Sequence, residues 1–514
     1  MSKEINNMKK QTTISFYTQG CRLNQSETAV LENQFKMPDL DSHLSYKKNL
    51  SEEIRNEDPV FLSVPVTDSA DITVVNTCTV TERGDTDTKK LIKKLTKLNP
   101  SVKIALIGCQ AQVHKEKLLE WPNVHWVIGN ASKMNLKKIL DEHYSDREQE
   151  KGITDLKETS DVINEADDSM TIESELGKKD EPLSTDEKHK QPQVIVPKIT
   201  REPFTIPNPG IDSSHVRANI KIQDGCDFYC AFCVIPFARG PARSRVFEDI
   251  FKEVDSLVES GHREIIITGI NLGTYSDSNK SFLDVLNRLE SYEKLDRVRI
   301  SSIEPTTIDD DVVHLMKTSN KLCNYFHIPL QSGSDPVLEG MKRKYTLAEF
   351  ESFLSFVHKS NPDACLGTDV IVGFPGETDE EFENTYTYLR DSVLNYFHVF
   401  SYSERKFARS KRMDGQVHGA KIKERSFKLR KLSHRKKMQY FSRFLGQTTE
   451  VLVEQQKKGY WEGLTENYIR VRFKVNETEL NKNAIEEGQL KNKMVMVRLV
   501  SLNEDMEKVE GELI

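Results

Sequence analysis

Residues 225–240 read GCDFYCAFCVIPFARG and directly follow a strand-like run, Arg217–Ile222. The stretch contains Cys226, Cys230 and Cys233, separated by three and two residues. Three thiolates this close can ligate three irons of one [4Fe–4S] cluster and leave the fourth iron without a protein ligand. Zinc is the competing interpretation, but structural zinc usually takes four ligands in two separated pairs, and the sequence has no second CxxC pair. The spacing therefore favours an iron–sulfur cluster with one open iron.

The cysteine motif follows the first of a series of strand-like runs that alternate with helical patterns up to about Tyr402. Such a run of βα units favours an α/β fold with a complete or partial parallel barrel. The predicted strands are Arg217–Ile222, Glu264–Thr268, Arg297–Ser301, Phe326–Pro329, Gly367–Val372 and Phe397–Ser401.

The N-terminal residues 11–144 also alternate between strand-like and helical patterns. Three predicted strands, Thr13–Tyr17, Ile72–Val75 and Ile104–Ile107, are each followed within a few residues by a cysteine. Ligands collect at the carboxyl ends of strands in open parallel sheets, so the three cysteines are expected to converge. The alternative is three unrelated buried thiols. The cysteines are Cys21, Cys78 and Cys109.

Charge is unevenly distributed along a chain whose net charge is −7. From Ser145 to Gln191 there are 15 acidic and 7 basic residues, and the segment 145–205 is predicted to be a disordered insert or linker. From Arg405 to Lys437 there are 14 basic and 2 acidic residues. This stretch either binds phosphates or forms the solvated face of an amphipathic helix.

Residues 447–514 have the pattern of a small β-barrel, with predicted strands at Glu450–Glu454, Tyr468–Val475 and Met494–Leu502. Tyr468 and Phe473 are either RNA-stacking aromatics or part of the barrel core. No cluster cysteine lies here, so removal of the segment is expected to leave the clusters intact.

The rest of the composition favours a cytoplasmic protein that does not bind a membrane. The N-terminus is polar, unlike a signal peptide, and no apolar run reaches the ~18 residues of a transmembrane helix. Eight cysteines in 514 residues are too sparse for a disulfide framework.

The sequence as a whole resembles the radical S-adenosylmethionine (SAM) methylthiotransferase family. The resemblance rests on the cysteine motif within QDGCDFYCAFCVIPFARGPARSR and on ordered matches elsewhere. These matches are TQGCRLNQSET, VVNTCTVTERGD, LIGCQAQ, ITGINLGTY, SSIEP, HIPLQSGSD, GTDVIVGFPGET and, as in a TRAM domain, GLTENYIR. Two features depart from the family pattern: an insertion around Met37–Val66, and YSERKFARS at Tyr402–Ser410 where the family has YSxRxGTxA.

The resemblance implies four segments. These are an N-terminal α/β domain with an auxiliary [4Fe–4S] cluster (11–144), the acidic insert (145–205), a radical SAM partial (β/α) barrel (206–446) and a TRAM-like RNA-binding β-barrel (447–514).

By the same resemblance, Cys226, Cys230 and Cys233 hold the cluster that cleaves SAM, and Cys21, Cys78 and Cys109 hold the auxiliary cluster. Contacts to SAM are expected from seven further residues: Phe232, Gly269, Asn271, Gln331, Ser332, Gly373 and Glu377. Cys323 and Cys365 match no cluster position and are expected to be ordinary buried thiols.

The implied reaction uses two SAM molecules and transfers a methylthio group to an adenosine of tRNA. One SAM methylates a sulfur on the auxiliary cluster, and the second yields a 5′-deoxyadenosyl radical that removes the hydrogen from C2 of adenine. The implied partners are a tRNA anticodon stem-loop, an electron donor such as flavodoxin or ferredoxin, and a sulfur donor.

The motifs GCRLNQSE, NTCTVT and ARGPARSR most resemble the branch acting on N6-threonylcarbamoyladenosine at tRNA position 37. The alternatives are N6-isopentenyladenosine at the same position and an aspartate of a ribosomal protein. Outside enzymes, an iron–sulfur RNA-binding or electron-carrying protein is the remaining alternative.

Overall fold

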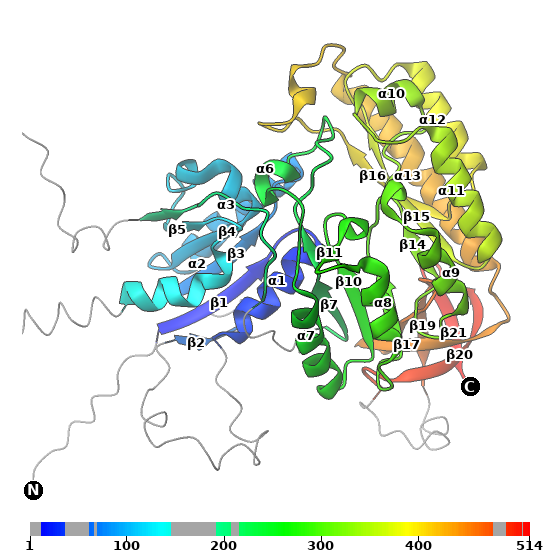
Figure 1. Cartoon of the computed structure of the whole chain (residues 1–514), viewed down its shortest axis with the longest axis horizontal. Coiled ribbons are helices and arrows are strands. Elements are labelled where there is room, and N and C mark those ends of the chain that lie inside the picture. Colours follow the sequence, from blue (N-terminus) through cyan, green and yellow to red (C-terminus); the bar gives the residue numbers. More distant parts are fainter. Residues whose placement is uncertain are drawn as a thin grey trace, which may run out of the picture. The chain divides into compact units, whose positions relative to one another are not determined.

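The computed structural model describes residues 12–35, 61–65, 69–144, 192–206, 215–475, 490–505 and 507–514 (Figure 1). Two compact units form this part of the chain. The first is built on the N-terminal sheet. The second contains most residues from Ile199 onward together with residues 19–33 and 78–86. Most of the acidic insert, residues 145–191, and most of the predicted Met37–Val66 insertion lie outside the described residues.

The first unit contains a parallel sheet whose strands run in the order β2-β1-β3-β4-β5-β6. Strand β3 is buried along its whole length, as expected for a central strand of a parallel sheet whose two faces are covered. The strands are β1 (Thr12–Thr18), β2 (Phe61–Ser63), β3 (Ile72–Thr77), β4 (Lys103–Gly108), β5 (Val124–Ile128) and β6 (Gln193–Ile195). Strand β6 belongs to the stretch that the sequence pattern assigns to the insert.

Three helices follow strands of this sheet along the chain: α1 (Arg22–Asn33), α2 (Glu82–Leu98) and α3 (Cys109–His114). Helix α1 belongs to the second unit, where it packs against β7 (Arg217–Lys221).

The second unit contains a partial barrel of two parallel sheets. Strands β7, β10 (Glu264–Thr268) and β13 (Arg297–Ile300) form one, and β14 (Tyr325–His327), β15 (Cys365–Val372) and β16 (Tyr396–Ser401) form the other. Parallel bridges Val298–Leu322 and Ser302–His327 join the two sheets. The structure thus confirms the partial parallel barrel and all six predicted strands.

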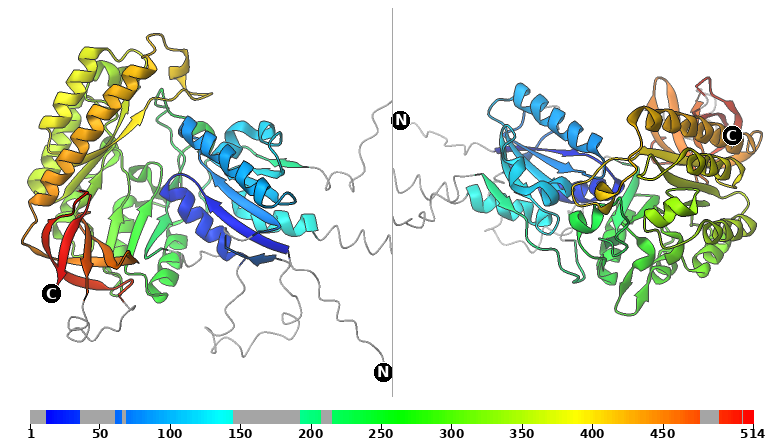
Figure 2. Two further views of the ribbon diagram at one scale, coloured as in Figure 1. Left: turned by 180° about the vertical axis from the view of Figure 1, so that it is seen from behind. Right: turned by 90° about the horizontal axis from the view of Figure 1, so that it is seen from above.

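Helices cover the outside of this barrel (Figure 2). Their apolar faces and the strands form one core of Val, Ile, Leu and Phe side chains, because a helix must bury its apolar stripe against another element. The helices are α7 (Phe247–Glu259), α8 (Phe282–Glu290), α9 (Asp310–Thr318), α10 (Asp335–Gly340), α11 (Leu347–Ser360), α12 (Asp379–Asp391) and α13 (Gly419–Ser442). The short helix α6 (Ile235–Arg239) directly follows Cys233. Short strand pairs are β8 (Gln223–Asp224) with β9 (Arg243–Ser244), and β11 (Ser276–Asp277) with β12 (Lys280–Ser281).

The C-terminal strands form a closed barrel in the order β17-β18-β19-β21-β20. They are β17 (Thr448–Lys457), β18 (Tyr460–Thr465), β19 (Arg470–Lys474), β20 (Met494–Leu502) and β21 (Val509–Leu513). The predicted β-barrel is confirmed, although β18 and β21 have no counterpart among the predicted strands.

This closed barrel shares a hydrophobic core with the base of the partial barrel, where Tyr325 and Tyr396 pack near Val451 and Val471. Buried Arg297 donates to Leu464 O at 2.9 Å and to Glu450 O at 2.8 Å. Removing residues 447–514 would expose this core. That the clusters survive the truncation stays a prediction.

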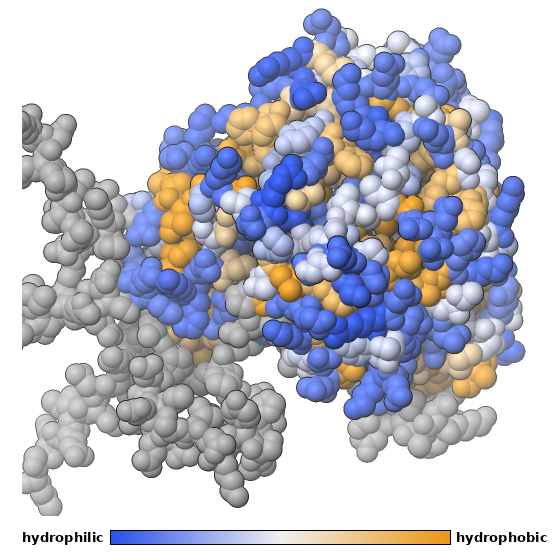
Figure 3. Space-filling model, in the orientation of Figure 1, coloured by the Kyte–Doolittle hydropathy of each residue, from blue (hydrophilic) through white to orange (hydrophobic). Residues whose placement is uncertain are grey.

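Hydrophilic and hydrophobic residues are interspersed on the face shown in Figure 3. Within the described residues, no helix combines the length and the apolar composition needed to cross a membrane.

Candidate active site

The loop after β7 arranges the three clustered cysteines around a turn that only glycine fits. Gly225 has φ +72°, and a Cβ there would lie 2.0 Å from Pro241 O. The Cys226 N–H donates to Gly240 O at 3.1 Å, and the Cys233 N–H donates to Cys230 O at 3.0 Å. These bonds hold the three thiols along one compact loop.

Each of the three sulfurs receives a hydrogen bond. The Phe228 N–H lies 3.5 Å from Cys226 Sγ, the Ile235 N–H lies 3.4 Å from Cys233 Sγ, and Arg343 Nη1 lies 3.2 Å from Cys230 Sγ. Burial raises the pKa of Cys226 to about 11 and the pKa of Cys233 to about 12, and it also raises the pKa of Cys230. The thiols are thus protonated at neutral pH, and a metal that binds them must release those protons.

Gln223 connects this loop to the end of β10. Its Oε1 accepts from the Ile270 and Asn271 N–H groups at 2.9 and 2.8 Å, and its Nε2 donates to Asp224 O and Gly225 O. The side chain is fully buried, so one residue fixes two of the loops that border the same cavity.

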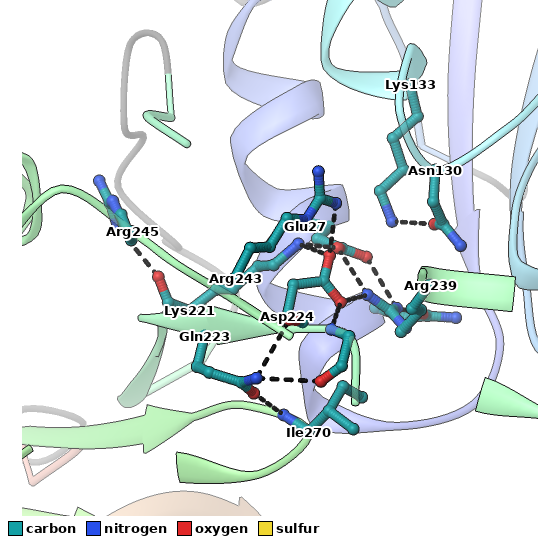
Figure 4. A network of polar contacts seen from close by, with 12 residues as sticks. Glu27, Asn130, Lys133, Lys221, Gln223, Asp224, Arg239, Arg243, Arg245 and Ile270 are labelled. Carbon is teal, nitrogen blue, oxygen red and sulfur yellow. Dashed lines mark hydrogen bonds and ion pairs between the residues drawn. The ribbon is translucent and has the colours of Figure 1, made fainter. Parts of the chain in front are cut away.

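A buried network of five charged side chains lies behind the cysteine loop (Figure 4). Glu27 of α1 accepts from Lys221 Nζ at 2.7 Å and from Arg239 at 3.1 and 3.2 Å. Asp224 accepts from Lys221 at 2.6 Å, Arg239 at 3.0 Å and Arg243 at 3.1 Å. The network ties the helix that begins just after Cys21 to both ends of the loop that carries Cys226.

The second predicted set of cysteines follows three neighbouring strands. Register pairs Thr18 with Asn76 and Thr77 with Gly108, so β1, β3 and β4 end at the same edge of the sheet. Cys21, Cys78 and Cys109 come within three residues of those strand ends along the chain.

Two glycines leave space beside these cysteines. Gly20 has φ +99°, and a Cβ there would lie 2.5 Å from Cys78 Cβ and 2.9 Å from its Sγ. Gly108 has φ +93°, and a Cβ there would lie 2.5 Å from Asn76 Oδ1. In the first unit, Asn130 Nδ2 lies 3.6 Å from the buried Cys109 sulfur.

A cavity of about 560 Å³ opens inside the second unit, and Cys226, Cys230 and Cys233 line it together with Cys21. Of the residues expected to contact SAM, Phe232, Gly269 and Gln331 also line it. A Cβ at Gly269 would lie 2.7 Å from Leu272 and 3.1 Å from Gln223, so a larger residue would crowd the loop.

The other four residues expected to contact SAM do not line this cavity. Asn271 Oδ1 accepts from the Thr307 hydroxyl at 2.9 Å, and the Ser332 hydroxyl lies 3.2 Å from that of Thr385. Glu377 forms a buried ion pair with Arg425 and accepts from the Gly373 N–H at 3.0 Å. Through these contacts, Gly373 and Glu377 connect the end of β15 to α13.

The sequence patterns named several polar cavity residues only as parts of motifs and gave them no role. Glu304 pairs with Arg343, which also contacts the Cys230 sulfur. His327, Asp369 and His398 line the cavity from β14, β15 and β16. Alternation along these strands could have identified the three residues, since side chains two residues apart on a strand face the same side of the sheet.

The three cysteines of the loop after β7 fit one iron–sulfur cluster with an open iron. Cys323 and Cys365 are buried in the core as expected. In the described part of the chain, no three His, Cys, Asp or Glu side chains converge closely enough to hold a single metal ion. Thiolates that ligate a cubane bind separate irons, so they need not converge on one point.

The altered loop Tyr402–Ser410 packs against the cysteine loop. The Ser410 N–H donates to Ala231 O at 2.9 Å, and the Tyr402 hydroxyl lies 2.9 Å from the Ser410 hydroxyl. Arg405 pairs with Asp85. This loop thus supports the cysteine loop without the Gly-Thr of the family pattern.

Phe473 is 1% exposed and belongs to the core of the closed barrel. Tyr468 instead lines the cavity and stacks on Tyr325, with ring centroids 4.4 Å apart. Neither residue therefore lies on a free strand face. Stacking on RNA, one of the two roles expected for them, would require such a face.

Comparison with known proteins agrees with this geometry. The radical SAM superfamily profile matches residues 220–389, and the profile described as uncharacterized protein family UPF0004 matches residues 13–129. A threonylcarbamoyladenosine tRNA methylthiotransferase MtaB of Bacillus subtilis is 32% identical over 91% of this chain and 92% of the relative. Its counterpart from Aquifex aeolicus is 30% identical over 89% and 96%.

A tRNA-2-methylthio-N(6)-dimethylallyladenosine synthase of Thermodesulfovibrio yellowstonii is 29% identical over 79% of this chain and 84% of the relative. The fold and the cysteine loop thus define a radical SAM enzyme. With relatives that match it over almost their whole length, the chain belongs to the radical SAM methylthiotransferase family, which confirms the resemblance seen in the sequence.

Proposed function

We propose that this protein adds a methylthio group to C2 of N6-threonylcarbamoyladenosine at position 37 of tRNA. The observation that carries the proposal is the shared cavity, because Cys21 of the dispersed set and all three cysteines of the loop line it. Transfer of a methylthio group to a carbon activated by a radical requires that both reagents reach one substrate atom.

In this proposal, Cys226, Cys230 and Cys233 ligate the cluster that binds SAM, and Cys21, Cys78 and Cys109 ligate the auxiliary cluster. A [4Fe–4S] cluster with an open iron supplies the binding site and the electron for reductive cleavage of SAM. Phe232, Gly269 and Gln331 border the same space, and Arg343 donates to the Cys230 sulfur.

Basic residues of α13 are proposed to bind the tRNA backbone. Lys428, Lys431 and Arg435 line an open groove with the exposed ring of Phe427, which can stack on a base. Other basic residues of this stretch are used structurally, since Arg425 is buried with Glu377 and Arg430 donates to Val399 O. An electron donor such as flavodoxin or ferredoxin and a sulfur donor complete the proposal.

Residues 11–144, 206–446 and 447–514 are proposed as the N-terminal, radical SAM and TRAM-like domains. The close relatives named for dimethylallyladenosine make the prenylated nucleoside the second candidate substrate. Membership in a family of enzymes disfavours a purely RNA-binding role.

Nucleoside mass spectrometry of tRNA from a deletion strain tests the proposal. Loss of the methylthio derivative of threonylcarbamoyladenosine, restored by the wild-type chain but not by Cys226→Ala, is the expected result. Loss of the methylthio derivative of a prenylated adenosine instead would favour the second candidate.

A further inference from the structure

Strands β14, β15 and β16 contribute a layer of three polar side chains to the cavity wall, namely His327, Asp369 and His398. Register pairs His327 with Gly367 and Asp369 with His398, which places the three polar side chains of β14, β15 and β16 on the inner face. His327 Nε2 lies 3.2 Å from Asp369 Oδ1, and the two imidazole centroids lie 5.6 Å apart.

His327 lines the cavity and carries an unsatisfied, buried ring nitrogen. Its Nδ1 lies 2.8 Å from the Ser302 hydroxyl, whereas its buried Nε2 has no hydrogen bond of good geometry within the described structure. The side chain is 7% exposed. Buried polar atoms are almost always satisfied, so an unpaired nitrogen on a residue that lines the cavity points to a polar ligand.

Aromatic rings close the cavity beneath this layer. A Cβ at Gly367 would lie 2.4 Å from the Tyr396 ring, so the absence of a side chain at this position leaves room for the ring. The Tyr396 and Tyr325 hydroxyls lie 2.7 Å apart, and Tyr468 stacks on both rings. Tyr468 comes from the closed C-terminal barrel and has φ +68°, a conformation that costs energy for a bulky side chain.

Arg22 supplies a cation at the same end. Its Nη2 donates to the Tyr468 hydroxyl at 3.3 Å, and its side chain lines the cavity directly after Cys21. Among the residues described, no carboxylate lies within ion-pair distance of this guanidinium, whereas Arg343, the other cavity arginine, is paired with Glu304. Arg22 is therefore the cavity cation available to an anionic substrate.

The two candidate nucleosides differ in the group on N6. A threonylcarbamoyl group carries a carboxylate, a hydroxyl and a urea, whereas an isopentenyl group is apolar and would leave these buried polar groups unpaired. A site built to hydrogen-bond a polar group rejects an analogue that lacks it far better than an apolar pocket rejects an added polar group.

We propose that this layer selects the threonylcarbamoyl group, with Arg22 and the Tyr468 hydroxyl binding the threonine carboxylate and with His327 and His398 contacting its polar remainder. Asp369 accepts from the threonine hydroxyl and keeps the carboxylate directed toward Arg22 by charge repulsion. The inference rests on the proposed function and adds to it the residues that choose between the two nucleosides.

The test uses full-length reconstituted enzyme and two forms of one tRNA, with the threonine carboxylate either free or converted to its methyl ester. For the wild-type enzyme, kcat/KM for the free acid should exceed that for the ester by about 10- to 100-fold, as expected for a hydrogen-bonded charge. In Arg22→Gln the acid should fall to the level of the ester, while the ester changes little. Arg22→Lys should restore part of the preference.

Iron content and SAM cleavage without tRNA are measured for each variant, because Arg22 neighbours Cys21. Arg288→Gln, on the outer helix α8 and paired with Glu248, is the matched control and should keep the full preference. His398→Phe probes the same layer far from any cluster cysteine in sequence, and should lower activity on the threonylcarbamoyl tRNA without changing iron content.

An Arg22→Gln enzyme that loses activity on acid and ester equally, or that keeps the preference for the acid, would overturn this role of Arg22. A wild-type enzyme that gives no methylthio product on threonylcarbamoyl tRNA, but does so on prenylated tRNA, would overturn the proposed function and this inference with it.

Discussion

The two sets of cysteines are distributed differently along the chain. Cys226, Cys230 and Cys233 lie within eight residues of one loop, and that loop's own hydrogen bonds fix them. Cys21, Cys78 and Cys109 instead each follow a different strand of the N-terminal sheet, far apart in the chain. A local motif tolerates changes elsewhere in the fold, whereas a dispersed one depends on the topology of a whole domain.

The largest expected effect comes from the local set. Replacing Cys226, Cys230 and Cys233 with Ala should lower the iron content from about eight to about four per chain and abolish SAM cleavage, because the open-iron cluster is lost. Iron analysis and detection of 5′-deoxyadenosine measure the two effects. Cys323→Ala, at a core thiol, is the control and should change neither.

Replacing the dispersed set should separate SAM cleavage from methylthio transfer. With Cys21, Cys78 and Cys109 changed to Ala, we expect about four irons, continued formation of 5′-deoxyadenosine and no methylthio product. The same assays apply. Full iron content in this variant would mean that the auxiliary cluster has other ligands.

The ionic network behind the cysteine loop can be broken at Glu27. Glu27→Ala leaves Lys221 and Arg239 buried with one carboxylate fewer, which should cost about 3–5 kcal/mol of unfolding free energy. Glu248→Ala, at an exposed pair with Arg288, should cost less than about 1 kcal/mol. Denaturant unfolding compares the two, and equal losses would contradict a structural role for the buried network.

The turn before Cys226 offers a smaller and sharper comparison. Gly225→Ala combines a left-handed backbone with a clash against Pro241 O, whereas Gly261, with φ +87°, has nothing within 4 Å of the added Cβ. Gly261→Ala should cost only about 1–2 kcal/mol of backbone strain, and Gly225→Ala should cost more and reduce cluster incorporation. Thermal unfolding and iron content would show whether the two variants differ.

The smallest effect is expected on tRNA affinity. Reversing the charge of Lys428 and Lys431 in the α13 groove should weaken binding several-fold and reduce the slope of log K against log salt by about one per lost phosphate contact. Filter binding across a salt series measures the slope. Lys252→Glu, on α7, gives a charge change of the same kind outside the groove, and an equal effect there would argue against a specific surface.

Strand patterns and short motifs in the sequence were enough to predict part of the fold and of the candidate site. The six barrel strands and the cysteine loop follow from alternation and spacing, since both are local. The sequence did not predict β5, nor β2 and β6, which have only three residues each. Nor could it predict that Glu27 pairs with Lys221 and Arg239, because those partners are 194 and 212 residues apart in the chain.

Tyr468 shows a second limit of sequence patterns. The alternation of residues allowed Tyr468 either an RNA-stacking face or the barrel core. In the structure its ring stacks on Tyr325, and its backbone is in the left-handed region. Tertiary contact with another domain decided its position, and no pattern within residues 447–514 contains that information.

The shared core at the base of the partial barrel also has a consequence for the order of synthesis. Arg297 and Arg299 find their carbonyl acceptors, Leu464 O and Thr465 O, 167 and 166 residues later in the chain. Until the ribosome has made that segment, both guanidiniums lack these carbonyl acceptors and the base of the barrel stays open. Such long-range closure is slow, so the cysteine loop can form well before its barrel is complete. Insertion of iron during translation would therefore meet an unfinished scaffold, which favours loading after the chain is released.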